Sequence, residues 1–246
     1  MPVILIFVFG LIVGSFLNTC IHRLPRKESL LAPPSYCPRC RHRLYPLDLL
    51  PLLGYLFLQG KCRYCREPIS WRYPTVELLM GLAAVALYYH REPATLFPAL
   101  VVTAVALVAA CTDLEHGIVP DALVLPTLGA GLLYSFFSPL VSPGSSIAAL
   151  LLGGGSLLAI AFLSGGGMGG GDIKLMAALG TWLGWRLLLI VLFLSFLVGG
   201  IGGIWLLLLK IKGGRDPIPF APAIALALFL ALVGEDFLMN YYWLMP

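Results

Sequence analysis

Long apolar segments separated by short polar ones run along most of the chain. Stretches of about 17–25 apolar residues are long enough to cross a bilayer as helices. We expect spans near residues 3–20, 75–90, 95–111, 122–137, 146–164, 173–185, 187–209 and 221–239. The division between the sixth and seventh spans at Trp185–Arg186 is weak, so a total of seven is also compatible with the pattern. The predicted fold class is an all-α polytopic membrane protein with about eight transmembrane helices.

Composition supports this prediction, because 59% of the 246 residues are hydrophobic and only 11% are charged. A soluble domain is closer to half apolar and a quarter charged. The first apolar segment, Val3–Cys20, lacks a basic n-region and a small-residue cleavage site. We therefore expect it to remain as the first span and not to be removed as a signal peptide.

The basic residues predict an orientation in the membrane. Ten of the 16 lysines and arginines lie between His22 and Arg72, and short basic loops stay in the cytoplasm. With eight spans, four more basic residues fall on that side: Lys174, Lys210, Lys212 and Arg215. Only Arg91 and Arg186 fall on the opposite side. We therefore expect a multi-pass membrane protein with its N-terminus outside the cytoplasm.

The net charge of +4 comes mostly from this one basic loop. Attraction to anionic membrane lipid accounts for such a loop. Nothing else in the sequence supports binding to nucleic acid, so lipid and not nucleic acid is the expected partner.

Four cysteines in the basic loop form two Cys-x-x-Cys pairs, Cys37 with Cys40 and Cys62 with Cys65. Two such pairs at this separation are typical of a structural zinc site, in which four thiolates complete a tetrahedron. A redox-active pair of dithiols is the alternative. Four thiolate ligands leave no open position for water, so the expected metal has a structural role. The apolar segment Leu47–Leu58 between the pairs is too short and broken to cross the membrane.

Isolated aspartates mark two segments at the ends of apolar stretches, Asp113 in 111–121 and Asp172 in 169–174. Carboxylates near hydrocarbon are costly and are usually functional. The expected topology puts both on the cytoplasmic side. Two carboxylates that meet at a partly dry site share one proton, and the pair can activate water against a peptide carbonyl. Which of the two starts protonated is left open by the sequence.

Several other catalytic motifs are excluded. The glycine-rich run 165–171 contains G-x-G-x-x-G, but no strand pattern precedes it and no acidic residue follows between Asp172 and Asp216. A Walker A loop fails because Leu175 follows Lys174. The sequence contains neither the H-E-x-x-H of zinc peptidases nor the G-x-S-x-G of serine hydrolases.

The residues around Asp172 are candidates for substrate contact. Gly169, Gly170 and Gly171 leave the backbone open to an extended substrate. Close packing of helices is an equal alternative from the glycines alone, and the adjoining Asp172 favours the substrate. Lys174 is expected to point away from Asp172 and to contact phospholipid or another carboxylate.

Two further acidic residues are candidates with structural alternatives. Asp121 is expected to act as the N-cap of the next helix, with direct chemistry as the alternative. Glu77 is expected in the first turn of the second span, where the helix dipole favours it, and it becomes a functional candidate if it faces the interior.

These residues resemble the bacterial type IV prepilin peptidases (leader peptidase/N-methyltransferase), a G-x-G-D aspartyl protease family, over nearly the whole chain. The segments that carry the resemblance are Gly14-Ser15-Phe16-Leu17-Asn18, His22-Arg23-Leu24-Pro25, the two Cys-x-x-Cys pairs, residues 69–77, residues 113–121, Gly169-Gly170-Gly171-Asp172-Ile173-Lys174-Leu175 and Ile218-Pro219-Phe220-Ala221-Pro222. The resemblance implies that Asp113 and Asp172 are the catalytic residues.

The resemblance also implies the reaction. The substrate would be the short basic leader of a prepilin or pseudopilin, cut after glycine at the cytoplasmic membrane face. The new N-terminal residue would then be methylated with S-adenosylmethionine as donor. Such an enzyme would serve type IV pili or type II secretion.

The expected domains are a first transmembrane helix at 1–21, a cytoplasmic tetracysteine domain at 22–73 and a transmembrane aspartyl peptidase domain at 74–246. A transporter with Asp113 and Asp172 as a proton relay is the main alternative, but the chain shows no convincing internal repeat. A membrane scaffold whose zinc loop binds a secretion partner is the second alternative.

Overall fold

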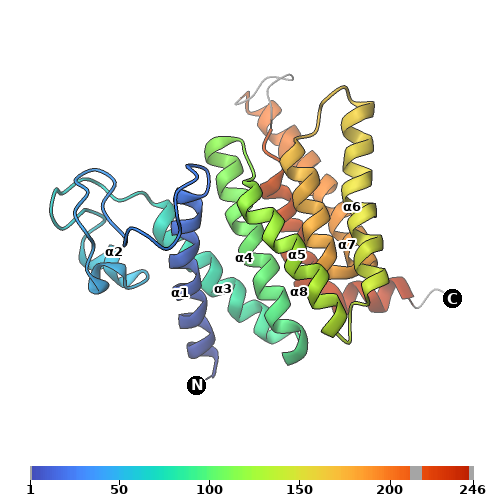
Figure 1. Cartoon of the computed structure of the whole chain (residues 1–246), viewed down its shortest axis with the longest axis horizontal. Coiled ribbons are helices and arrows are strands. Elements are labelled where there is room, and N and C mark those ends of the chain that lie inside the picture. The colour runs from blue at the N-terminus through green and yellow to red at the C-terminus, as the bar shows by residue number, and fades with distance from the viewer. Residues whose placement is uncertain (1, 211–217, 244–246) are drawn as a thin grey trace. The chain divides into compact units, whose positions relative to one another are not determined.

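The computed structural model describes residues 2–210 and 218–243, with side chains described up to residue 234. In this part of the chain the structure is helical and contains no β-strand beyond two isolated bridges. The elements are α1 (Pro2–Arg23), the 3-10 helix η1 (Pro46–Leu49), α2 (Leu53–Phe57), α3 (Arg72–His90), α4 (Pro93–His116), α5 (Asp121–Phe137), α6 (Pro143–Leu163), α7 (Gly170–Leu208) and α8 (Ala221–Trp243) (Figure 1). The predicted all-α class is confirmed. The chain divides into two compact units, Met1–Leu100 and Val101–Pro246.

In the first unit, α1 and α3 pack closely through glycines. A Cβ atom added at Gly10 would lie 2.8 Å from the Cα of Gly81, and one added at Gly14 would lie 2.7 Å from the Cα of Glu77. Small residues at such contacts let two membrane helices approach each other. These contacts pair the end of α1 with the start of α3, so the two helices run antiparallel.

In the second unit, α5, α6 and α8 each pack against α7 (Figure 1). The Trp182 side chain joins α7 to α5, because its Nε1–H donates to the backbone oxygen of Thr127 at 2.8 Å and its ring stacks on Tyr134. The hydroxyl of Ser146 in α6 donates to the backbone oxygen of Thr181 at 2.9 Å. Satisfied polar contacts of this kind hold helices together where lipid gives no hydrophobic drive between them.

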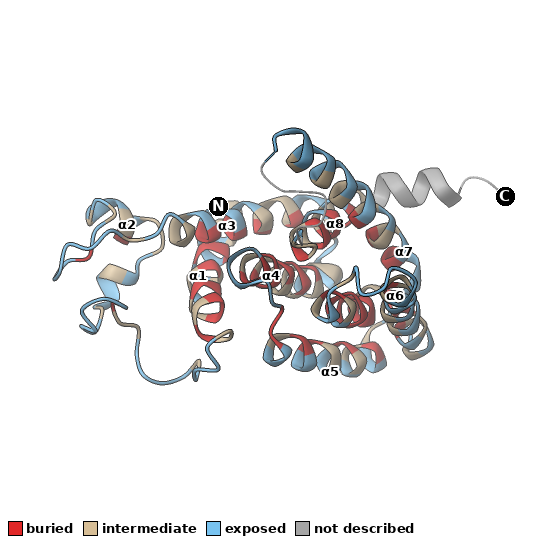
Figure 2. Ribbon diagram, turned by 90° about the horizontal axis from the view of Figure 1, so that it is seen from above, coloured by how far each residue is buried: buried red, intermediate tan, exposed pale blue. Residues whose placement is uncertain are grey.

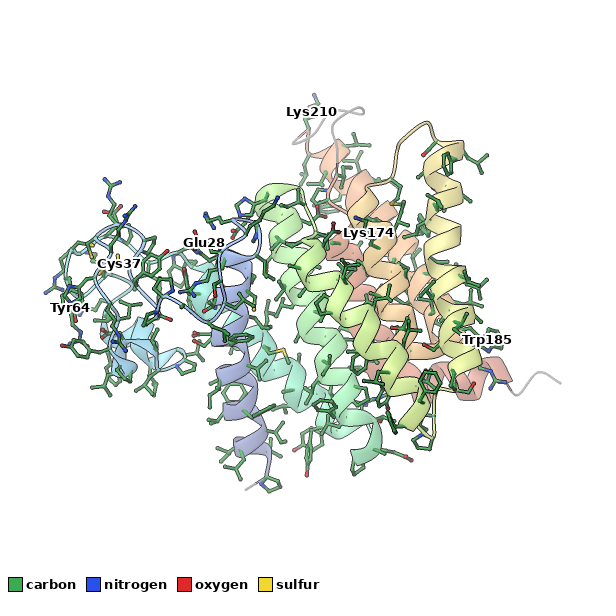
Figure 3. All side chains as sticks on the ribbon, viewed as in Figure 1. Glu28, Cys37, Tyr64, Lys174, Trp185 and Lys210 are labelled. Carbon is green, nitrogen blue, oxygen red and sulfur yellow. The ribbon has the colours of Figure 1, made fainter. Side chains whose placement is uncertain are left out.

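The long helix α7 is broken at Gly184, and the chain reverses direction there, so that the parts before and after the break run in opposite directions (Figure 3). Gly184 has φ 74° and ψ 168°, a conformation that glycine adopts without a Cβ penalty. The N–H of Trp185, freed by the break, donates to the hydroxyl of Ser145 at 3.3 Å. Figure 3 shows Lys174 and Lys210 at one end of the unit and Trp185 at the other. The weak division predicted at Trp185–Arg186 is therefore a real reversal of the chain, one residue earlier.

Large apolar side chains cover much of the outer surface of the helices. Exposed examples in the second unit are Leu133, Phe136, Phe162, Phe193 and Ile201, and Figure 2 shows exposed residues along the outer sides of α5 and α6. Four described helices are long and apolar enough to cross a membrane, namely α1, α4, α6 and α7, and α5 and α8 are shorter apolar helices. Exposed apolar side chains in such number are typical of helices that cross a membrane and not of a soluble protein.

Candidate active site and metal centre

Asp113 lies in the last turn of α4. The expected span ended at residue 111, but the helix continues to His116. Gly117 terminates it, with a φ of 65° and an N–H that donates to the backbone oxygen of Asp113 at 2.8 Å. The Asp113 carboxylate is almost buried, with 9% of the residue exposed. Its Oδ2 accepts a hydrogen bond from the backbone N–H of Ala221, at the start of α8, at 3.1 Å.

Asp172 lies in the first turn of α7, which begins after Gly169 in an extended conformation. It is 7% exposed, and its Oδ1 is buried without a hydrogen-bond partner among the described residues. The first turn of α7 lies against the loop that follows Asp113, because a Cβ added at Gly171 would be 3.0 Å from the Cβ of Val119. The structure therefore brings together two segments, far apart in the sequence, that each carry a nearly buried carboxylate. Two carboxylates at such a place are candidates to hold and activate water.

The three glycines before Asp172 have different surroundings. A Cβ added at Gly171 would lie 3.0 Å from the Cβ of Val119 and 3.3 Å from its backbone nitrogen. Gly171 therefore lets the start of α7 lie directly against the loop that follows Asp113. By contrast, a Cβ at Gly170 would meet no described atom within 4 Å, and one at Gly169 would lie 3.0 Å from Oδ2 of Asp172. The chain's own packing accounts for Gly171, and Gly169 lies against the Asp172 carboxylate, while the space beside Gly170 is open.

Lys174 and Asp121 contact each other. The Lys174 ammonium donates to Oδ1 of Asp121 at 2.8 Å, and both side chains are about half exposed. The prediction that Lys174 points away from Asp172 to another carboxylate agrees with this contact. The N-cap prediction for Asp121 is wrong, because Pro120 occupies the N-cap of α5 and no side chain caps the helix there. The ion pair joins the two segments that carry the buried aspartates.

Glu77 belongs to the first unit and anchors the cysteine loop there. Its Oε2 accepts the backbone N–H of Leu52 at 2.8 Å, and Leu52 has a φ of 59° that non-glycine residues rarely adopt. The expectation that Glu77 lies in the first helical turn is wrong, because α3 begins at Arg72 and Glu77 falls in the second turn. Glu77 is 7% exposed, so it does face the interior of its helix pair.

The two Cys-x-x-Cys pairs form two equivalent turns. In each turn the N–H of the first cysteine donates to the backbone oxygen five residues later, from Cys37 to His42 and from Cys62 to Glu67. An arginine with positive φ follows the second cysteine of each pair, Arg41 at 58° and Arg66 at 61°. The repeated conformation shows that both turns present their thiols in the same way.

The four sulfur atoms of Cys37, Cys40, Cys62 and Cys65 lie within 4.8 Å of one another, and those of Cys37 and Cys65 are 3.8 Å apart. Four thiolates about 2.3 Å from a tetrahedral metal stand about 3.8 Å apart. Burial raises the pKa of Cys62, but the backbone N–H groups of Cys65 and Tyr64 and the neighbouring thiols lower it to about 7. The cluster therefore fits a metal ion.

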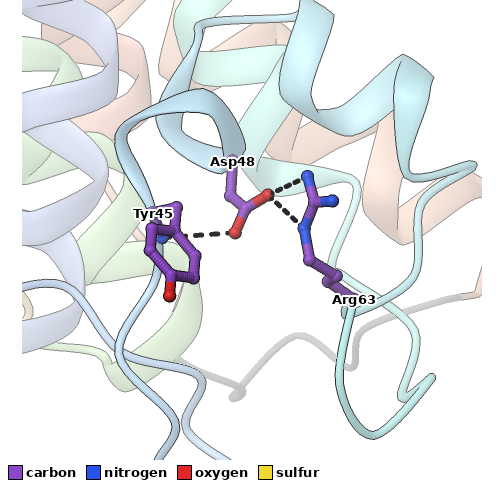
Figure 4. Close-up of polar contacts among 3 residues, drawn as sticks. All are labelled: Tyr45, Asp48 and Arg63. Atoms are coloured by element: carbon purple, nitrogen blue, oxygen red, sulfur yellow. Dashed lines mark hydrogen bonds and ion pairs between the residues drawn. The ribbon is translucent and has the colours of Figure 1, made fainter.

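Asp48 ties the 3-10 helix η1 to the second cysteine turn (Figure 4). Its side chain is 1% exposed, and Oδ1 accepts from Nε and Nη2 of Arg63 at 2.8 and 2.6 Å. Its Oδ2 accepts the backbone N–H of Tyr45 at 3.2 Å. These hydrogen bonds fix η1 against the second cysteine turn, where the neighbouring apolar side chains Leu47 and Leu49 are exposed.

Comparison with known proteins matches the chain to two family models. Residues 8–91 match a bacterial peptidase A24 N-terminal domain, and residues 100–204 match the type IV leader peptidase family. A prepilin leader peptidase/N-methyltransferase of Aeromonas hydrophila is 41% identical over 97% of this chain and 92% of the relative.

Proteins with the same name from other bacteria are also similar. The Bacillus subtilis protein is 39% identical over 97% of this chain and 96% of the relative, and the Pseudomonas aeruginosa protein is 36% identical over 95% and 90%. No solved structure matches the chain.

Proposed function

The chain belongs to the type IV leader peptidase family, and on that premise we propose that Asp113 and Asp172 are the two carboxylates with which it removes prepilin leaders. Prepilin leader cleavage and N-methylation are the activities of this family member. The observation that supports the residue assignment is that two nearly buried carboxylates, from α4 and α7, lie on segments held against each other by the Gly171–Val119 contact and the Lys174–Asp121 ion pair. A buried acidic pair has little structural value because its charges repel each other.

In the proposed reaction, the pair holds one proton between two carboxylates. The ionised member takes a proton from water, whose oxygen attacks the scissile carbonyl carbon. The protonated member gives its proton to the carbonyl oxygen, so no net charge builds up in the site. Collapse of the tetrahedral species breaks the C–N bond, the leaving amine takes up a proton from the pair, and one hydroxyl of the tetrahedral species returns a proton to the pair.

We propose that the leader is cut after glycine at the cytoplasmic face of the inner membrane. The substrate would lie along Gly169 and Gly170, which are exposed beside Asp172. Lys174, Asp121 and Glu77 remain candidates for contact with the leader or for positioning of the loops. The methyl group added to the new N-terminus is proposed to come from S-adenosylmethionine.

Incubation of the chain in membranes with a purified prepilin and methyl-labelled S-adenosylmethionine tests this function. We expect a mass loss equal to the leader and a labelled N-terminal residue on the product, measured by mass spectrometry. A proton-coupled transporter or a scaffold would leave the prepilin uncut. Persistent full-length prepilin, with a known leader peptidase active under the same conditions, would refute the function.

We propose that the metal at the four cysteines is zinc, which would order the loop and take no part in either reaction. Zinc suits four thiolates, and apolar side chains of the loop such as Leu47, Leu56 and Phe57 are exposed and form no core that would order it.

Elemental analysis is expected to find about one zinc ion per chain. Cys62→Ser should lose the metal, because the cluster is then left with three thiolates. Cys20→Ala, which removes a buried cysteine of α1 outside the cluster, should keep it. A protein with intact cysteines that never acquires zinc would argue against the assignment.

A further inference from the structure

The first turn of α8 offers one backbone N–H to Asp113. Pro222 has no N–H, and the N–H groups of Ala223 and Ile224 donate to the backbone oxygen of Phe220 at 3.0 and 3.1 Å. The N–H of Ala221 is directed at Oδ2 of Asp113 at 3.1 Å, and Ala221 is fully buried. The first turn of α8 therefore directs one N–H, that of Ala221, at the carboxylate of Asp113.

Asp172, the other member of the pair, has no comparable hydrogen bond to its Oδ1 among the described residues. This oxygen atom is buried. An ionised carboxylate oxygen in this position would lose its hydration and gain no donor in return. A protonated carboxyl group is neutral and carries a donor of its own, so the site suits the protonated form of Asp172.

Helix dipoles by themselves would favour the opposite assignment. Asp172 lies in the first turn of α7, where negative charge is favoured, and Asp113 lies in the last turn of α4, where it is disfavoured. The positive end of α8 offsets the negative end of α4 at Asp113. A hydrogen bond made directly to a carboxylate is also stronger than the dipole effect spread over a helical turn.

We propose that the Ala221 N–H is a positioning group that keeps Asp113 ionised as the base, while Asp172 holds the proton. This inference rests on the proposed function. Asp113 takes a proton from water as the water oxygen bonds to the carbonyl carbon, and Asp172 gives its proton to the carbonyl oxygen. When the C–N bond breaks, Asp113 passes its proton to the leaving nitrogen. One hydroxyl of the tetrahedral species returns a proton to Asp172, which restores the starting state.

Infrared spectroscopy with site-specific carbon-13 labels tests which aspartate is protonated. Suppressor-tRNA translation can place aspartate labelled at its side-chain carboxyl carbon at position 113 or 172 of the otherwise natural protein. We expect the label at Asp172 to shift the carbonyl stretch of a protonated carboxylic acid, and the label at Asp113 to shift a carboxylate stretch. The reverse pattern, or an acid band that responds to both labels, would overturn the assignment.

An amide-to-ester exchange at Ala221 tests the positioning role, because it replaces the N–H by an oxygen and keeps the side chain. We expect kcat for leader cleavage to fall about 10- to 100-fold with KM unchanged, as for a lost hydrogen bond to a charged group. The matched control is the same exchange at Ala231, a fully buried residue further along α8, which should keep kcat close to that of the natural protein. Equal kcat for the two ester proteins would overturn the role of Ala221.

Failure of this inference can be distinguished from failure of the proposed function. If the natural protein cleaves prepilin and both aspartates are essential, but the Ala221 ester is fully active, only the positioning role is lost. If the natural protein does not cleave prepilin, the proposed function fails first.

Discussion

Asp113→Asn and Asp172→Asn are each expected to abolish leader cleavage, with kcat reduced by about four orders of magnitude or more. Each change keeps the shape of the side chain and removes a group that must exchange a proton with water or with the peptide. Because the two carboxylates act as a unit, the double variant should be little worse than either single variant. Turnover is best measured with a purified prepilin and the protein in membranes.

Glu115→Gln is the matched control for loss of a carboxylate in the same turn of α4. Glu115 is exposed, so this variant should cleave at close to the natural rate. Zinc content and the unfolding temperature of both aspartate variants should stay close to those of the natural protein, since amide and carboxylate are nearly the same size. Near-natural turnover by either single aspartate variant would refute the acidic pair.

Apolar patterning predicted the helices well because each must cross a layer of fixed thickness. The expected spans at 122–137 and 146–164 correspond to α5 at Asp121–Phe137 and α6 at Pro143–Leu163. Helix ends were less predictable where polar residues continue a helix beyond the apolar stretch. The extension of α4 to His116 is an example, because its end depends on the left-handed conformation of Gly117 and not on hydropathy.

The candidate residues of the proposed site were visible in the sequence, but the contacts that support them were not. Charge in an apolar chain singled out Asp113 and Asp172, and the spacing of the cysteines predicted their cluster. The Ala221 N–H was missed because a backbone donor has no residue signature. The proline after it, in a segment noted only through family resemblance, was the available signal.

The two segments with the buried aspartates are joined by packing as well as by charge. Gly171 touches Val119, and Lys174 pairs with Asp121, so the start of α7 is held against the loop between α4 and α5. The exposed ion pair contributes little stability by itself, about 0–1 kcal/mol. The close glycine contact is therefore the main steric constraint on the approach of these two segments.

Gly171→Val is expected to lower kcat/KM for leader cleavage about 100-fold, the scale of loss from a misplacement of about 1 Å in an active site. The new Cβ would start 3.0 Å from the Cβ of Val119, and two further methyl groups would force α7 away from the loop. The separation would pull Asp172 from Asp113. Leader cleavage by the protein in membranes, followed over several prepilin concentrations, measures this loss.

Gly155→Val is the matched control, because a Cβ at this exposed position of α6 meets no described atom within 4 Å. It introduces the same side chain into a helix, so any general cost of valine appears in both variants. We expect it to retain most of the natural activity, and both variants to keep their zinc. Equal activity of the two variants would show that the contact between Gly171 and Val119 does not set the distance between the carboxylates.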